Sequence, residues 1–267
     1  MHIHVPKPLH GWQALLNEIF VIVIGILIAL AFEQAVEQMH WRHKVEDGEE
    51  RLKTETVNNV FVAAETVAVS NCEMAILNRM RTAITTSGAR PVTLPVYATP
   101  SDIWLTAQGD RGNVLPFVPR LYSSSIWTSL VQDGTSTHME PARQRSLGAI
   151  YGQVIRLDEM SRATRISQGE LSPLGDGLVL DAASRLSLAQ AVGRAETQMR
   201  YKLLMAEQVI LSLRRQKLEP TREETDKRLK LATERMYGKL CRDVGAPLID
   251  WYDAIKPYET APDLVKK

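Results

Sequence analysis

Glu37 and His40 have the residue types and the spacing of a metal-binding motif. Glu37-Gln-Met-His40 matches the E-x-x-H pattern of di-iron helical bundles, in which a glutamate and an imidazole share one helix face, and His43 and Asp47 follow nearby. Such a site also needs a second E-x-x-H motif and two more carboxylates, and the sequence contains no second copy. We therefore interpret these residues as a charged collar beside an apolar segment, and we predict no metal ligands.

The remaining histidines do not belong to a recognisable catalytic set. His2, His4 and His10 fall in residues 1–11, which we expect to be an N-terminal tail, and chain termini rarely form catalytic sites. His138 lies in QDGTSTHMEP, which resembles a loop before a helix and has no G-x-S-x-G nucleophile motif around it. Neither glycine-rich phosphate-binding pattern occurs in the chain. We predict no catalytic residue, no cofactor-binding residue and no enzymatic activity.

Two cysteines, Cys72 and Cys241, are too few for a disulfide scaffold and have no metal-binding spacing. Isolated thiols are most often small buried apolar groups. A bridge between them is the alternative if the domain faces an oxidising compartment, and it would join the first soluble helix to the last.

The strongest signal in the chain is an uncharged apolar run from Ile19 to Phe32 (IFVIVIGILIALAF). Its 14 residues extend only about 21 Å as a helix, which is short of a bilayer core of about 30 Å. Extension back to Trp12, a residue suited to the membrane interface, gives an adequate length. We predict a transmembrane helix over residues 12–32.

A cleaved signal peptide is the alternative interpretation of the same run. Lys7 would supply its positive region, and Ala29-Leu30-Ala31 would supply an A-x-A cleavage site. However, Glu18 interrupts the leading segment, and the sequence after Ala31 contains no proline and only one glycine as far as residue 55. We therefore favour an uncleaved anchor whose helix continues beyond the membrane.

One face of the predicted span carries small residues. Glu18, Ile22, Gly25 and Ala29 follow spacings of four, three and four, which place them on one side of a helix, and Gly25 and Ala29 form a small-xxx-small pair. We predict that this face packs against a second copy of the chain or another membrane protein. The alternative is that the face has no specific partner, because small residues are common in membrane helices.

The rest of the chain has the pattern of a helical protein. Its 32 Lys and Arg nearly balance its 31 Asp and Glu, so nothing indicates nucleic-acid binding. Apolar residues at near-heptad spacing predict one long helix over residues 33–88, followed by an irregular connection with short helices over 89–139. Short helices are expected from Ser101 or Asp102 and over 125–132. Longer ones are expected over 140–166, 181–218 and 221–244, forming a bundle over 140–250 before a tail over 251–267.

Two local patterns refine these helices. Thr221-Arg-Glu-Glu224 is a capping box that predicts a helix start. Charged residues lie mainly off the apolar stripe of the 181–218 helix, so we expect them to form a solvated face. These residues are Arg200, Lys202, Arg214, Arg215 and Lys217.

The chain resembles a family of uncharacterised bacterial membrane proteins, a domain of unknown function. The resemblance rests on EIFVIVIGILIAL from Glu18, then Glu33, Trp41-Arg42 and Glu50-Arg-Leu52, and more loosely on IWTSLVQDG and ARQRSLGAIYGQV in the middle. It implies an N-terminal span, a helical domain and an address in a bacterial inner membrane, with no activity or cofactor. On this basis we expect a periplasmic soluble domain, although Lys and Arg after the span favour the cytoplasmic side.

These patterns together predict a mostly α protein, in which a transmembrane helix continues into a long helix that packs into an elongated antiparallel bundle. Helices with apolar packing faces and no recognisable set of catalytic or metal-binding residues are typical of a membrane-anchored interaction or scaffold protein. A single-span ligand-sensing bundle is the alternative, because helical bundles can bind small molecules between their helices.

Overall fold

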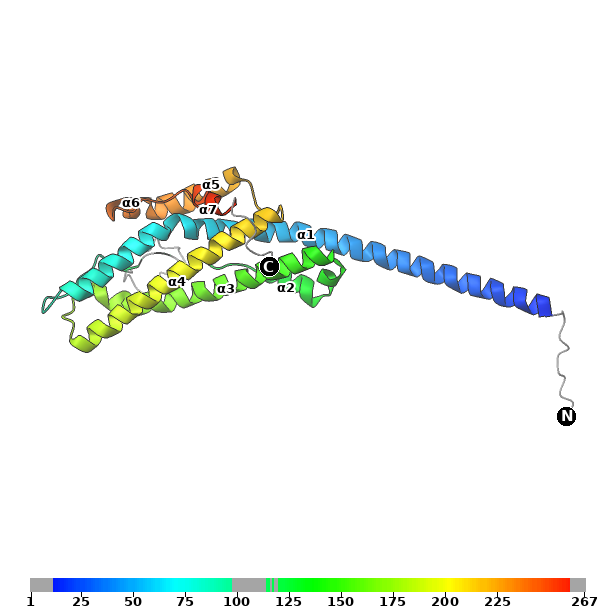
Figure 1. The fold of residues 1–267 in the computed structure, drawn as a ribbon, viewed down its shortest axis with the longest axis horizontal. Coiled ribbons are helices and arrows are strands. Elements are labelled where there is room, and N and C mark those ends of the chain that lie inside the picture. Colours follow the sequence, from blue (N-terminus) through cyan, green and yellow to red (C-terminus); the bar gives the residue numbers. More distant parts are fainter. Residues whose placement is uncertain (1–11, 98–113, 116, 118–119, 260–267) are drawn as a thin grey trace, which may run out of the picture.

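The computed structural model describes residues 12–97, 114–115, 117 and 120–259. This part of the chain is built from helices, as predicted (Figure 1). The long helices are α1 (Trp12–Thr86), α3 (Pro141–Leu171) and α4 (Ala182–Arg215). The shorter ones are α2 (Ser125–Gln132), α5 (Arg222–Leu229), α6 (Arg235–Asp243) and α7 (Trp251–Glu259), with single turns η2 (Thr135–His138) and η3 (Ser172–Gly175) and a π-helical segment η4 (Lys230–Glu234).

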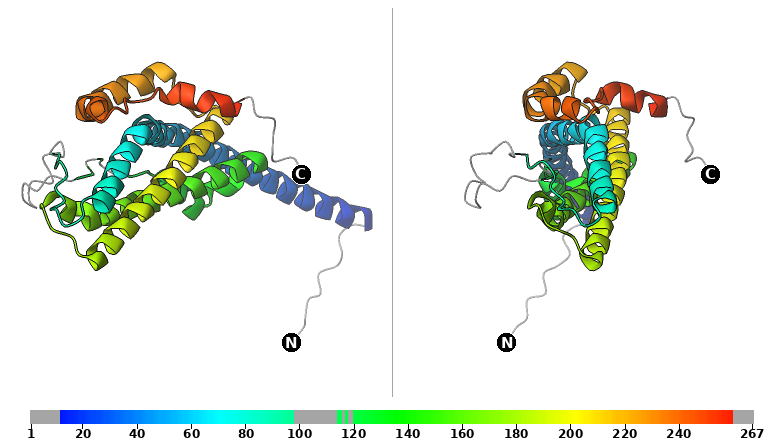
Figure 2. Two further views of the ribbon diagram at one scale, coloured as in Figure 1. Left: turned by 60° about the vertical axis from the view of Figure 1, so that its left-hand side comes forward. Right: turned by 90° about the vertical axis from the view of Figure 1, so that its left-hand side faces the viewer.

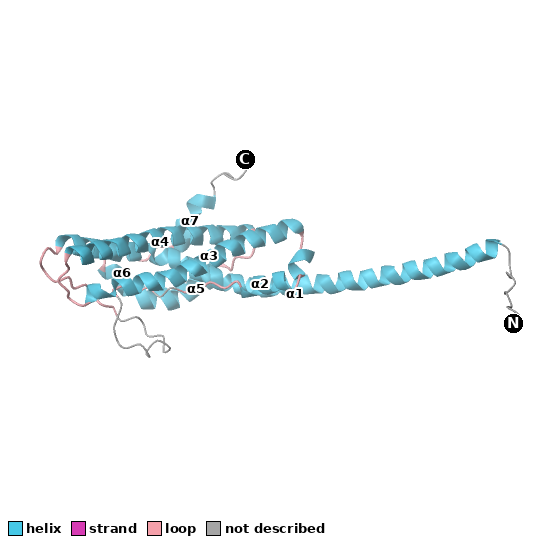
Figure 3. Cartoon of the chain, turned by 90° about the horizontal axis from the view of Figure 1, so that it is seen from below, coloured by secondary structure: helices cyan, strands magenta, loops and turns pink. Residues whose placement is uncertain are grey.

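Helix α1 is continuous from the apolar run into the bundle and extends beyond it at one end (Figures 1 and 3). Its most apolar 18-residue window has a mean hydropathy of 2.7 and is 0% buried by the rest of the chain. α1 therefore carries a segment long and apolar enough to cross a membrane, and no other described part of the chain covers that segment.

The soluble half of α1 changes direction where its colour passes from blue to cyan (Figure 2). Neither proline nor glycine occurs between residues 49 and 87, so the bend has another cause. Thr66 Oγ1 donates to the carbonyl of Val62 at 3.0 Å and Ser70 Oγ to that of Val67 at 2.8 Å, a type of bond that often bends helices. On the outer side of the bend, the backbone N–H of Ile249 donates to Ala68 O at 3.1 Å.

Two apolar cores lie one after the other along the bundle. α1 packs mainly against α4, and α4 packs against α3 along its length (Figure 3). The core nearer the apolar segment of α1 includes Leu52, Tyr151 and Ile210, and the distal core includes Leu77, Leu171 and Val192. On α3 and α4, buried polar residues such as Ser161 and Lys202 separate the segments that contribute to the two cores, whereas on α1 the two segments adjoin at Val67 and Val69.

The helix ends confirm most of the capping predictions. α1 stops at Thr86, before Gly88, which has a φ of 55°. α2 has the predicted bounds, and Gly134 follows it with a φ of 80°. The Asp181 side chain accepts from Ser184 N at 2.7 Å at the start of α4. Thr221 and Glu224 form both bonds of the capping box that opens α5.

Three features differ from the sequence-based expectation. α3 runs five residues beyond 166, because Gln168 donates to the carbonyls of Leu115 and Phe117 and so packs inside the fold. The helix expected over 221–244 contains the π-helical segment η4. Part of the expected tail over 251–267 is helix α7, which begins where Asp250 Oδ1 accepts from Tyr252 N at 2.9 Å. The helix expected at Ser101 or Asp102 lies outside the described residues.

Cys72 and Cys241 form a disulfide bridge, with their Cα atoms 5.2 Å apart. Both side chains are fully buried in the distal core. The bridge joins α1, at a position beyond its bend, to α6. Of the two interpretations of these cysteines, isolated buried thiols or a disulfide bridge, the structure therefore has the bridge.

Candidate functional site

The collar motif lies on α1 between the apolar run and the bundle. Glu37 accepts from Trp41 Nε1 at 3.4 Å, and His43 Nδ1 lies 3.7 Å from Glu46 Oε2. Among the described residues no group of three His, Cys, Asp or Glu side chains could hold a metal ion. The fold therefore places no second set of metal ligands beside Glu37 and His40 in the described part of the chain.

His138 lies against this collar, which the sequence analysis did not anticipate. Its ring stacks on Trp41 with centroids 3.9 Å apart, and Lys44 Nζ lies 4.9 Å from the Trp41 centroid. The turn η2 thus closes onto α1 near the predicted membrane exit. This contact positions the end of the bundle that lies beside the collar.

The predicted packing face of the span has no partner within the chain. Glu18, Ile22, Gly25 and Ala29 all lie on α1 and are exposed. A Cβ added at Gly25 would meet no atom within 4 Å. Close approach of a second helix at this face stays a prediction.

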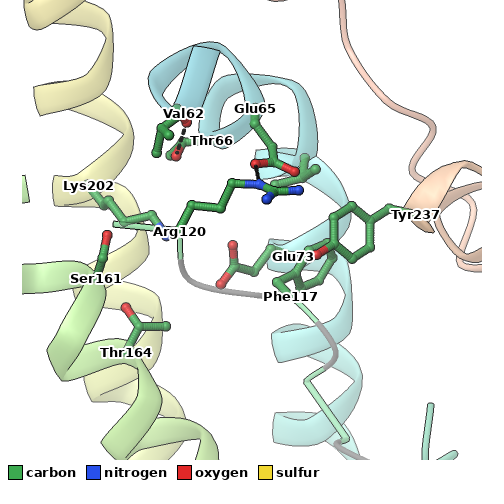
Figure 4. Close-up of a pocket in the computed structure, with 11 residues that line it drawn as sticks. Val62, Glu65, Thr66, Glu73, Phe117, Arg120, Ser161, Thr164, Lys202 and Tyr237 are labelled. Carbon is green, nitrogen blue, oxygen red and sulfur yellow. Dashed lines mark hydrogen bonds and ion pairs between the residues drawn. The ribbon is translucent and has the colours of Figure 1, made fainter. Parts of the chain in front are cut away.

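A pocket with four charged side chains lies inside the bundle, beside the bend of α1 (Figure 4). It is a cavity of about 20 Å³, enough for about one water-sized body. Its polar lining comes from five parts of the chain: Glu65, Thr66 and Glu73 from α1, Arg120 from the segment before α2, Ser161 and Thr164 from α3, Lys202 from α4, and Tyr237 from α6. The pocket occupies the polar layer between the two apolar cores.

Glu65 and Arg120 form an ion pair on one side of this pocket (Figure 4). Thr233 Oγ1, from the π-helical segment, donates to the other carboxylate oxygen of Glu65 at 3.4 Å. Burial raises the pKa of Glu65, and the Arg120 guanidinium opposes this shift. The π-helical segment thus places Thr233 against the pocket's acidic wall, and Tyr237 of α6 lines the pocket as well.

Glu73 and Lys202 lie on the other side of the pocket. Glu73 is 3% exposed and Lys202 is 9% exposed, and neither forms a hydrogen bond or ion pair with another described residue. Figure 4 shows both side chains and Ser161 extending toward the same space. Burial raises the pKa of Glu73, although the positive charge of Lys202 acts in the opposite direction.

The burial of Lys202 corrects the expectation of a solvated face on α4. Lys202 lies three residues after Met199 and four before Ala206, both of which are buried, so it occupies the apolar seam itself. Glu65 and Glu73 lie in the same way between buried residues at Val62, Val69 and Ile76. The helical spacing of these charges relative to apolar residues was the signal that could have identified the pocket.

A further buried carboxylate, Glu55, has a structural role. Glu55 Oε2 accepts from Ser123 Oγ at 2.8 Å, Ser125 Oγ at 3.0 Å and Ile126 N at 2.9 Å. It therefore binds the start of α2, where backbone N–H groups lack helical partners. Glu55 holds α2 on α1 and is fully engaged in doing so.

Comparisons with models of protein families, with curated protein sequences and with solved structures find no match to this chain. The resemblance to a family of bacterial membrane proteins stays a prediction.

Proposed function

We propose that this protein is a single-span membrane protein that holds a helical bundle at the membrane surface as an interaction or scaffold subunit. One observation carries the proposal: the apolar segment of α1 is bare, and it continues without a break into the helix that forms the wall of both cores. A continuous helix transmits position and rotation from the bilayer to the bundle. A bilayer on one side and a protein partner on the other account for this architecture, and neither catalysis nor nucleic-acid binding is part of the proposal.

The bundle is proposed to face the periplasm of a bacterial inner membrane. The supporting observation is the Cys72–Cys241 bridge, because disulfides persist in oxidising compartments and are rare in reducing ones. The test is mass spectrometry of thiols alkylated while cells are being lysed in acid. A bridged pair is expected, and free thiols on both cysteines would contradict the periplasmic orientation. The mass of the mature chain in the same experiment distinguishes an uncleaved anchor from a processed signal peptide.

Self-association is proposed to use Glu18, Ile22, Gly25 and Ala29 in the bilayer. A matched pair of variants tests this face, because residues two apart point about 200° away from each other around a helix. Ala29→Ile adds bulk to the face, whereas Ala31→Ile adds the same bulk to nearly the opposite side. Crosslinking and native mass in mild detergent should show oligomers for the wild type and Ala31→Ile and fewer for Ala29→Ile. A monomer without a partner in every sample would refute the proposed association.

A ligand-sensing bundle is the second candidate function, and the buried charged pocket favours it. Four charged side chains in a small cavity between two apolar cores cost stability unless each is paired. Thermal-shift screening of the full chain in detergent tests this candidate, with a reproducible rise in unfolding temperature as the expected result. Failure of every compound to shift the transition would count against sensing without touching the scaffold proposal.

A further inference from the structure

Only two of the four charged side chains in the pocket form an ion pair with each other. Glu65 and Arg120 form an ion pair, which leaves Glu73 and Lys202 facing the same cavity without a direct contact between them. A buried ammonium group requires a counter-charge or several hydrogen-bond acceptors in its surroundings. The pocket therefore lacks a partner for Lys202 within hydrogen-bond distance among the described residues.

Stability of the bundle does not explain why these two side chains are retained. Well-packed apolar residues of similar size are often as stable as a buried ion pair, and apolar cores adjoin the pocket on both sides. Glu73 and Lys202 come from different helices, α1 and α4, and converge with the Ser161 hydroxyl of α3. This convergence of polar groups on one space is what a binding site requires.

The protonation of Glu73 decides the net charge of the pocket. The titratable and charged groups that line the pocket with it are Glu65 from α1, Arg120, Lys202 from α4 and Tyr237 from α6. Burial raises the pKa of Glu73, so its neutral form is favoured relative to an exposed glutamate. Protonation of Glu73, with Glu65 paired to Arg120, would leave the ammonium group of Lys202 as the one uncompensated charge among these four side chains.

We propose that this pocket binds one monovalent anion of halide size, such as chloride, together with one proton on Glu73. Lys202 supplies the positive charge, and the hydroxyl of Ser161 and the protonated carboxyl of Glu73 supply hydrogen-bond donors. The volume limits the ligand to a single small ion, because a cavity of about 20 Å³ holds about one water-sized body. The inference names a ligand class for the sensing candidate and does not rest on the scaffold role, which the crosslinking of Ala29→Ile tests separately.

The experiment measures thermal unfolding of the full chain in detergent, with sodium chloride compared against sodium gluconate at equal ionic strength. Chloride that binds only the folded state raises the unfolding temperature, by ~3 °C or more at ten times its Kd. Because a proton binds with the anion, the shift should be larger at about pH 5.5 than at about pH 8. Line broadening of the chloride-35 NMR signal measures the same binding directly.

Two variants assign the effect to the pocket. Lys202→Met removes the positive charge at similar length and should raise the Kd for chloride by ~30-fold or more. Lys239→Met, at an exposed position on α6, is the matched control and should bind as the wild type does. Glu73→Gln imitates the protonated carboxyl, so chloride binding should persist in this variant and lose its pH dependence.

Equal unfolding temperatures in chloride and gluconate for the wild type would overturn the proposal. A chloride shift that Lys202→Met leaves intact would overturn it as well, since the anion would then bind elsewhere. If Lys202→Met does not fold, chloride binding by Glu73→Gln tests the proposal instead. Retained chloride binding at about pH 8 supports the proposal, and its absence at both pH values refutes it.

Discussion

Loss of the Cys72–Cys241 bridge should destabilise the bundle by several kcal/mol. The two cysteines are 169 residues apart, so the bridge closes most of the soluble chain into one loop. In the chain-entropy description, a loop of that length removes ~17 cal/mol/K from the unfolded state, or ~5 kcal/mol at about 25 °C. For a domain of this size, that loss lowers the unfolding temperature by ~10–20 °C.

The variants are Cys72→Ala, Cys241→Ala and the double substitution, each unfolded by heat and by urea in the same detergent. Either single substitution opens the whole loop, so the two single variants should lose nearly the same stability. The double variant should lose only ~1 kcal/mol more, because just the packing of the second buried sulfur remains to be removed. Wild-type protein unfolded in a strong reductant should match the single variants.

Additive effects of the two substitutions would show that each cysteine contributes through packing alone. A loss below ~1 kcal/mol in all three variants would refute the bridge as a constraint on unfolding. Both outcomes are distinct from the expected pattern of two equal and non-additive losses.

Three further changes test the interior. Glu55→Ala should lower the free energy of unfolding in urea by ~3 kcal/mol, because it leaves three donors at the start of α2 without their acceptor. Glu55→Asp keeps the charge and should recover part of this stability. A loss below ~0.5 kcal/mol in Glu55→Ala would contradict the role of Glu55 in holding α2 on α1. Leu77→Ala, at a fully buried position, should cost ~2–5 kcal/mol, and a near-neutral effect would mean that the distal core is loosely packed. The raised pKa values of Glu65 and Glu73 mean that the folded state holds protons more tightly than the unfolded state, so their contribution to stability falls as pH rises from 4.5 through the folded-state values. Urea unfolding across that range should show a shallower decline for Glu65→Gln combined with Glu73→Gln than for the wild type, and parallel curves would contradict the assignment.

Helix ends were predictable because the groups that terminate a helix are adjacent in sequence. Thr221 and Glu224 are three residues apart and satisfy each other's backbone donors, whatever the rest of the fold does. Gly134 ends α2 for a similarly local reason, because its left-handed backbone conformation favours glycine. Continuity of α1 from the apolar segment into the bundle was also predictable, since no helix-breaking residue occurs there except Gly48, which packs against Leu130.

The candidate site was not predicted, because its formation depends on which helix faces which. The seam position of Lys202 indicates a buried lysine, but which charged groups of α1 face it depends on how the helices pack. At the bend of α1, the hydroxyl bonds of Thr66 and Ser70 are local, but the carbonyl of Ala68 also accepts from Ile249, which follows it by 181 residues. The π-helical segment that brings Thr233 to Glu65 has no recognisable sequence signal either.

The disulfide bridge and the charged pocket are physically coupled. Cys72 directly precedes Glu73, and Cys241 lies four residues, about one helical turn, after Tyr237, which lines the pocket. The bridge therefore fixes the distance between the two walls of the pocket that α1 and α6 supply. Opening the bridge allows α6 to move away from α1 and admits water beside Glu73, which reduces the burial that raises its pKa. Chloride binding should then weaken in Cys241→Ala, although Lys202, Glu73 and Ser161 are all retained in that variant.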